Sequence, residues 1–227
     1  MKKMIEEYLG ISIHDLHLFE LAFTHRSAVN ESKKITTHNE RLEFLGDAVL
    51  ELIVTDYLYK TFPDLQEGIL TNLRASLVKT ETLAEVAKEL KFGDLLKISR
   101  GEEMFGGREK TSLLANTVEA AIGAMYRDSG LEVAKHWVTK NIIPRLDDIM
   151  KSGDFVDSKS QFQHFAQAEL KMTPHYKELS STGPDHDKEF EVGVFVGEKQ
   201  YGVGRGASKQ IAQQSSAKNA LESLNRL

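Results

Sequence analysis

Four carboxylates interrupt a mostly apolar segment of this 227-residue chain. The segment 39–52, NERLEFLGDAVLEL, carries Glu40, Glu43, Asp47 and Glu51. On a helix that turns about 100° per residue, the first three of these share a stripe about 60° wide. The opposite side, which we expect to face the core, holds Leu42, Leu45, Val49, Leu52 and Ile53.

This carboxylate stripe has three competing interpretations. A carboxylate that is buried without a partner is costly, so buried carboxylates pair with bases or bind metal ions. Arg41 and Arg74 are candidate bases for a salt-bridge network. Alternatively, the stripe faces water, or it supplies oxygen ligands to a cation.

A second apolar segment carries oxygen-bearing side chains at helical spacing. In LLANTVEAAIGAM, residues 113–125, Asn116 and Glu119 are three positions apart and therefore share one helix face. The alanines and the glycine of this segment would let another helix approach closely. Two such helices can converge on one hard cation, and an all-oxygen ligand set suits Mg²⁺ or Mn²⁺.

The elements that must position these side chains are helices. Apolar spacing predicts a helix over 79–92 and another over 111–128, whereas the glycines and charges of 99–110 predict an exposed loop. A helix over 131–150 is expected to break or kink at Pro144. The first 150 residues therefore read as one all-helical domain.

The composition changes at 151–158, KSGDFVDS, which reads as a short linker. Beyond it, the apolar spacing predicts a helix, three strands and a final helix opened by Ser208. These predicted elements cover 159–171, 175–182, 188–197, 198–207 and 208–227. A compact α+β domain of this kind is expected to follow the helical one.

Composition and charge narrow the class of protein. The chain has no cysteine, which excludes disulfides and thiolate metal sites, and its net charge is −5. We find no signal-peptide pattern and no apolar run long enough to span a membrane. Residues 153–198 carry a net charge of −5 and residues 199–227 a net charge of +4, so a basic end follows an acidic stretch.

The same segments carry a resemblance to a known family. HNERLEFLGDAVLEL, residues 38–52, resembles the signature of ribonuclease III. LAFTHRS at 21–27, PDLQEGILTNLRASLV at 63–78 and the 113–125 segment are similar to the other family blocks, in the same order. The C-terminal region resembles the double-stranded-RNA-binding domain.

This resemblance implies an endonuclease domain over 1–151, a linker over 152–156 and an α-β-β-β-α RNA-binding domain over 157–227. It implies a cytoplasmic homodimer that binds double-stranded RNA, without a membrane or a small-molecule cofactor. The implied reaction is Mg²⁺-dependent hydrolysis, with Mn²⁺ as a substitute, that leaves 5′-phosphate and 3′-hydroxyl ends. The implied substrates are structured precursors of rRNA, and some mRNAs and tRNAs.

The resemblance also implies roles for particular residues. Asp47 and Glu119 match catalytic carboxylates that bind metal together with Glu43. Glu40 and Glu67 match supporting acidic residues. The second helix departs from the family pattern, Asp-x-x-Glu, because it has Asn116 at the first position.

Asn116 leaves three interpretations open. Its carbonyl oxygen can still bind a hard cation, but it lacks the negative charge, so affinity for Mg²⁺ should fall. The residue is then a natural variant in an active enzyme, an engineered substitution, or the mark of a double-stranded-RNA-binding protein with weak or lost cleavage.

Four residues of the C-terminal domain match RNA-contacting positions. They are Gln163 in the first helix, His186 in the loop after the first strand, and Ser208 and Lys209 at the start of the last helix. Such domains read duplex RNA mainly by shape, through 2′-hydroxyl and phosphate contacts. His164 and Gln210 depart from the family pattern, which has Glu and a second Lys there.

Overall fold

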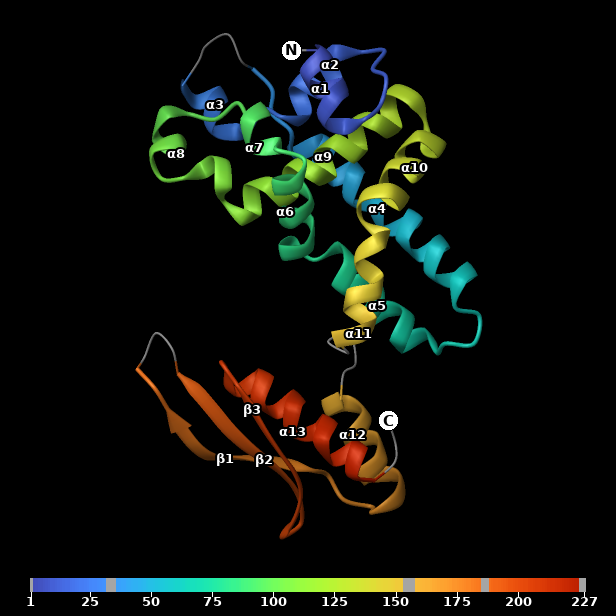
Figure 1. Ribbon diagram of the computed structural model, residues 1–227, viewed down its shortest axis with the longest axis vertical. Helices are drawn as coiled ribbons and strands as arrows, with labels where there is room; N and C mark the ends of the chain where they lie inside the picture. The colour runs from blue at the N-terminus through green and yellow to red at the C-terminus, as the bar shows by residue number, and fades with distance from the viewer. Residues whose placement is uncertain (1, 32–35, 153–157, 185–187, 225–227) are drawn as a thin grey trace. The chain divides into compact units, whose positions relative to one another are not determined.

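The computed structural model describes residues 2–31, 36–152, 158–184 and 188–224. The chain divides into two compact units, Met1–Phe155 and Val156–Leu227, and Figure 1 shows that the first is helical and the second combines a sheet with helices. This confirms the predicted fold class. Most of the linker expected at 152–156 lies outside the described residues.

The first unit is built from helices of very different length. Their bounds are α1 Lys2–Leu9, α2 Leu16–Ala22, α3 Arg26–Glu31, α4 Glu40–Thr61, α5 Glu67–Val78, α6 Thr80–Glu89, α7 Phe92–Leu95, α8 Arg100–Met104, η1 Gly107–Glu109, α9 Thr111–Ser129, α10 Leu131–Asn141, η2 Ile143–Arg145 and α11 Leu146–Ser152. The break predicted at Pro144 is confirmed, because this proline lies in the 3₁₀ turn η2 that separates α10 from α11.

The two longest helices, α4 and α9, pack against each other at the centre of this unit. Most of α9 is buried, including Leu114, Val118 and Ile122. A helix that is apolar nearly all round belongs inside a domain, which is where α9 lies. Both helices contribute to one hydrophobic core, which fixes the positions of their carboxylate-bearing faces relative to each other.

Two sequence expectations about this unit are wrong. Leu52, expected in the core, is 57 % exposed, while Leu50 and Val54 are fully buried in its place. The core-facing side of α4 is thus rotated from the predicted one. The predicted loop at 99–110 contains the short helix α8 and the turn η1, because Ser99 caps α8 by accepting a hydrogen bond from the Glu102 N–H.

The second unit has the predicted α-β-β-β-α order. Its elements are α12 Ser158–Glu169, β1 His175–Thr182, β2 Glu189–Val196, β3 Lys199–Gly206 and α13 Lys209–Ser223. The strands form one antiparallel sheet in the order β1-β2-β3, and α12 and α13 pack on one face of it (Figure 1). The small core between them holds Phe162, Ala166, Val194, Val196, Ala217, Ala220 and Leu221.

In the part of the chain that the structure describes, no helix is both long and apolar enough to cross a bilayer.

Candidate active site and RNA-binding surface

Two glycines bring the carboxylate-bearing helices together. A Cβ atom added to Gly46 on α4 would collide with the backbone carbonyl of Glu119 on α9. A Cβ atom on Gly123 would likewise collide with the carbonyl of Leu42. Only glycine permits backbones to approach this closely. The contact therefore sets Glu43 and Asp47 of α4 opposite Asn116 and Glu119 of α9.

Glu43 is half-buried and touches the second helix directly. Burial raises the pKa of its carboxyl, and the neighbouring charges of Glu40 and Asp47 raise it further. A hydrogen bond donated by the Asn116 side chain opposes this effect. The structure thus places residues 43 and 116, which the sequence predicts to share one site, near each other.

Glu119 has the most perturbed carboxyl of this cluster. Burial raises its pKa to about 7, with further contributions from the charges of Asp47 and Glu43. Two like charges nearby disfavour ionisation, and partial burial does the same. Near neutral pH, Glu119 is therefore divided between its protonated and ionised forms.

The donor chemistry of this cluster fits a hard cation. Glu43, Asp47, Asn116 and Glu119 offer only oxygen ligands, and the mutual repulsion of the three carboxylates is what a divalent cation would relieve. Within the described residues, no group of three or more His, Cys, Asp or Glu side chains is already arranged to hold a metal ion. The carboxylates thus influence one another without forming a closed coordination shell.

Glu40 lies at the exposed edge of the cluster, beside two bases. Its carboxylate is 3.6 Å from Arg26 Nη1 and 3.8 Å from His38 Nδ1. Sequence reasoning assigned no role to either base, although both lie within or beside the quoted motifs. The charge of Glu40 contributes to the raised pKa of Glu43, which is consistent with a supporting role.

Two other acidic residues have partners of their own. Glu51 forms an ion pair of 2.9 Å with Arg74, one of the two bases expected to pair with the carboxylates of this segment. Glu67 begins α5, is exposed, and accepts a hydrogen bond of 3.2 Å from Thr71. It is not among the groups that shift the pKa of Glu43 or Glu119.

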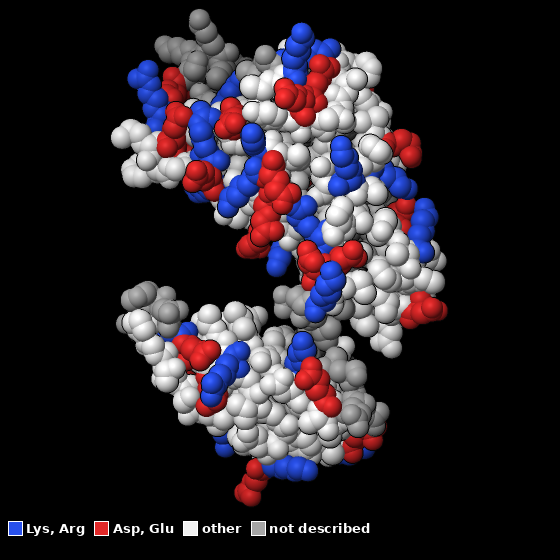
Figure 2. All heavy atoms as spheres, in the orientation of Figure 1, with Lys and Arg blue, Asp and Glu red and all other residues white. Residues whose placement is uncertain are grey.

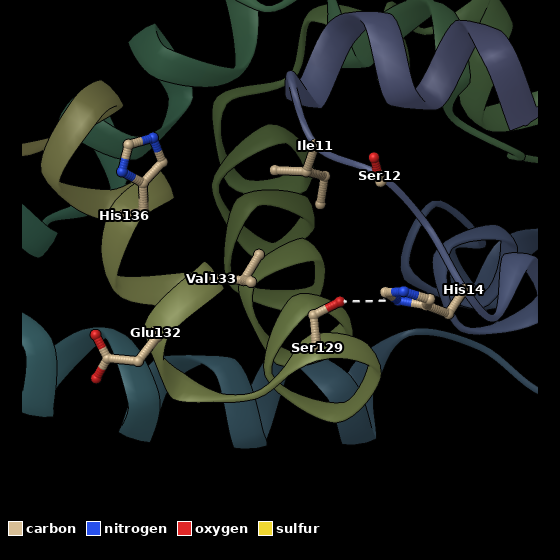
Figure 3. Close-up of a pocket in the computed structure, with 7 residues that line it drawn as sticks. All are labelled: Ile11, Ser12, His14, Ser129, Glu132, Val133 and His136. Carbon is tan, nitrogen blue, oxygen red and sulfur yellow. Dashed lines mark hydrogen bonds between the residues drawn. The ribbon is translucent and has the colours of Figure 1, made fainter.

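A separate cavity of about 500 Å³ lies where the chain after α1 meets the start of α10 (Figure 3). Its lining residues are Ile11, Ser12, His14, Ser129, Glu132, Val133 and His136, none of them a predicted site residue. Next to it, Asp128 accepts hydrogen bonds from Ser129 and from the backbone N–H groups of His14 and Asp15. These hydrogen bonds hold the segment that follows α1 against the end of α9.

The predicted RNA contacts of the second unit occupy its helices. Gln163 is exposed on α12, and the Ser208 hydroxyl caps α13 by accepting a hydrogen bond from the Ile211 N–H. Lys209 is exposed at the first position of α13 and pairs with Glu178. His186 lies outside the described residues. In Figure 2, basic and acidic side chains lie close together on the visible surface of this unit, without a broad basic face.

Comparison with known proteins decides the family. A ribonuclease-III-like family model matches residues 15–146, and a double-stranded RNA binding motif model matches residues 158–224. A protein named Ribonuclease 3 from Bdellovibrio bacteriovorus is 43 % identical over 97 % of this chain and 95 % of its own length. The chain belongs to the ribonuclease III family.

Other ribonuclease III proteins agree with this assignment. Ribonuclease 3 from Nitratiruptor sp. is 45 % identical over 98 % of this chain and 97 % of its own length. The solved nuclease domain of ribonuclease III from Campylobacter jejuni is 41 % identical and covers 63 % of this chain and 97 % of that domain, with a TM-score of 0.59. The Campylobacter jejuni domain shows structural flexibility in a region involved in its dimer formation.

Membership in the ribonuclease III family, with a double-stranded RNA binding motif in the same chain, makes this protein a double-stranded-RNA endoribonuclease. The alternative of a binding protein without efficient cleavage is not favoured. Ribonuclease III is generally a metal-dependent nuclease, in keeping with the all-oxygen cluster between α4 and α9.

Proposed function

We propose that this chain hydrolyses double-stranded RNA with Mg²⁺ and leaves 5′-phosphate and 3′-hydroxyl ends, acting as a cytoplasmic homodimer on structured precursors of rRNA, mRNA and tRNA. Mn²⁺ substitutes for Mg²⁺. The observation that carries this proposal is the coupled cluster of Glu43, Asp47, Asn116 and Glu119. The family assignment supports the substrate class.

The reaction requires water to attack phosphorus as the bond from phosphorus to the 3′ oxygen breaks. Glu43, Asp47, Glu119 and the carbonyl oxygen of Asn116 would hold a divalent cation. Such a cation, when bound, would polarise the phosphate and lower the pKa of the attacking water. Without a cation, burial and the charges of Asp47 and Glu43 raise the pKa of Glu119 to about 7, and a bound cation would favour its ionised form.

A cleavage assay tests this proposal directly. Duplex RNA of defined length is incubated with the full chain and Mg²⁺, and the ends of the fragments are mapped. Discrete products with 5′-phosphate ends are expected, and single-stranded RNA of the same sequence should stay intact. Binding without cutting across a full Mg²⁺ titration would contradict the proposal and revive the binding-protein alternative.

The homodimer is supported by a stripe of exposed apolar side chains along α4. Phe44, Leu52 and Tyr59 are 81 %, 57 % and 73 % exposed, and their spacing places them within about 80° of one another around the helix. Several large apolar side chains exposed on one side of a helix are typical of an interaction site. Light scattering should give twice the mass of the 25.5 kDa chain, and Phe44→Ser should shift that mass toward a monomer. A monomeric wild-type chain at micromolar concentration would refute the dimer.

A further inference from the structure

The lysine expected to contact RNA phosphate is already paired within its own unit. Lys209 Nζ lies 2.8 Å from a carboxylate oxygen of Glu178, which belongs to β1. The lysine side chain is 63 % exposed and the glutamate side chain 36 %, so both ends of the pair are accessible from solvent. A phosphate that approaches Lys209 therefore meets a carboxylate at the same ammonium group.

The strand register explains why Glu178 reaches α13. Glu178 is opposite Val192 in the β1–β2 ladder, and Val192 is buried. A register shift between Glu178 and Ser180 follows directly. Before this shift, alternation places Glu178 on the same side of β1 as Tyr176, which packs against the core formed with the helices. The carboxylate is therefore directed to the helix-covered face rather than the open one.

A second lysine lies near the Lys209–Glu178 pair. Lys209 lies 5.8 Å from the centre of the Phe190 ring, and Lys188 lies 5.7 Å from the same ring. The hydrogen bond and charge of Lys209 hold the pKa of the Glu178 carboxyl below its usual range, with smaller contributions from Ser181 and Lys188. The carboxylate is therefore ionised at neutral pH and cancels one of two positive charges at this end of α13.

We propose that Glu178 competes with RNA phosphate for Lys209 and so lowers the affinity of the second unit for duplex RNA. This inference rests on the proposed RNA-binding role of Lys209. A phosphate bound at this ammonium would lie close to the Glu178 carboxylate, and like charges at such separations repel. For RNA to bind, either Lys209 must break its ion pair with Glu178 or the phosphate must bind despite repulsion from the Glu178 carboxylate.

The test is the salt dependence of duplex binding by the full chain, measured without divalent cations so that the RNA stays intact. The probe is a labelled RNA duplex of about 24 base pairs, longer than the span of one such domain. Glu178→Gln should bind about three- to tenfold more tightly at low salt. Its plot of log affinity against log salt concentration should steepen by about one unit, since one more phosphate charge is neutralised.

Two further variants isolate the mechanism. Glu222→Gln removes the same charge near the other end of α13, about 20 Å along the helix from Lys209, and should leave affinity nearly unchanged. In a Lys209→Gln background, Glu178→Gln should lose most of its effect, because the two residues act through one contact. Thermal unfolding of each variant identifies any loss of fold.

The outcomes separate the competition from the RNA-binding role on which it rests. Unchanged or weaker binding by a folded Glu178→Gln variant overturns the competition. An equal gain in the Lys209→Gln background also overturns it, since the effect would then be a general charge effect. A wild-type chain that does not bind the duplex would overturn the RNA-binding role of Lys209 together with this inference.

Discussion

Two carboxylates on the same helix, α9, have opposite electrostatic environments. Glu119 faces α4, where burial and the charges of Asp47 and Glu43 raise its pKa to about 7. Asp128, near the end of the helix, has a fully covered side chain, which by itself would raise its pKa. Hydrogen bonds from Ser129 and from the Asp15 and His14 N–H groups outweigh burial and lower the pKa of Asp128 to about 2.

This difference is what we expect between a carboxylate that binds a cation, the role proposed for Glu119, and a structural one such as Asp128. Asp128 is surrounded by donors that were placed by folding, so its charge stabilises the native chain. Glu119 is surrounded by like charges that folding has not neutralised, so its charge destabilises the metal-free chain. Strained titratable groups of this kind concentrate at functional sites. Substitutions that alter one carboxylate environment and leave the other intact can test this contrast.

The largest effect is expected from Gly46→Ala, which removes the close approach that creates the Glu119 environment. The new Cβ would collide with the Glu119 carbonyl, a backbone atom that cannot rotate away. Overpacking typically costs about 1–3 kcal/mol, and a clash with a fixed backbone atom belongs at the upper end of this range or above it. We expect loss of cleavage together with a large fall in the midpoint of urea unfolding.

Gly68→Ala is the matched control for this change. Nothing lies within 4 Å of a Cβ at Gly68, which is in the first turn of α5. The same chemical change there should leave stability unchanged or raise it by about 0.5 kcal/mol. Comparable destabilisation by both variants would mean that the α4–α9 contact has no special role.

The next effect is that of Glu119→Gln, which should separate activity from stability. Cleavage should fall at least about 100-fold, because a neutral amide holds a hard cation less well than a carboxylate does. In the presence of a chelator, however, the variant should be more stable than wild type at pH 8, by on the order of 2 kcal/mol after allowance for solvent. Loss of activity with a gain of stability is the signature of a residue kept for function.

The sign of the pH dependence follows from the raised pKa. Because the folded pKa of Glu119 is about 7 and its unfolded value about 4.5, the folded chain binds more protons between these pH values. Wild-type stability without metal should therefore fall as pH rises from about 4.5 to 7. Thermal unfolding at pH 5 and pH 8 should show this slope in wild type and a smaller one in Glu119→Gln. Equal slopes would contradict the raised pKa.

Most of the fold could be predicted from the sequence because its signals are local. The apolar spacing of 111–128 and the position of Pro144 predicted α9 and the break after α10, and the alternation of 175–182 predicted β1. Leu52 was misplaced because a helix as apolar as α4 has no sharp hydrophobic face. Which apolar side remains exposed depends on tertiary contacts that spacing alone does not specify.

The site could be predicted only in part, for a similar reason. The spacing of the motifs predicted that Glu43 and Asn116 share one site, and the two side chains lie near each other. The hydrogen bond between His14 and Asp128 could not be predicted, because the two residues are distant in sequence and no periodic pattern connects them. The pairing of Lys209 with Glu178 was missed because it depends on strand register.

A smaller effect is expected from Asn116→Asp, which adds a fourth negative charge beside Glu119. The change removes the hydrogen bond that Asn116 donates to Glu43 and replaces it with repulsion, so the metal-free chain should lose stability. A charged ligand should also bind a hard cation more tightly, so half-maximal cleavage should need severalfold less Mg²⁺. Mg²⁺ titrations of both chains test this, and identical curves would show that residue 116 does not bind the ion.

The smallest effect is expected from Asp128→Asn, near the end of α9, where hydrogen-bond donors surround the carboxylate. The variant loses charge-assisted hydrogen bonds to the His14 and Asp15 N–H groups, at a cost of about 1 kcal/mol. Because the folded pKa of Asp128 is lowered to about 2 from an ordinary 3.8, its contribution is present above pH 4 and is lost as pH falls toward 2. Urea unfolding of both chains should differ at pH 7 and converge at low pH.

Glu132→Gln, on the wall of the same cavity, is the charge-matched control for Asp128→Asn (Figure 3). It removes one negative charge but keeps the hydrogen bonds that His14 and Asp15 donate to Asp128. The free energy of unfolding should therefore be nearly unchanged. Cleavage at saturating Mg²⁺ should be close to wild type in both variants, in contrast to Glu119→Gln. If Asp128→Asn instead reduced cleavage as strongly as Glu119→Gln, the two ends of α9 would not differ in role, and a perturbed pKa alone would not identify the active end of the helix.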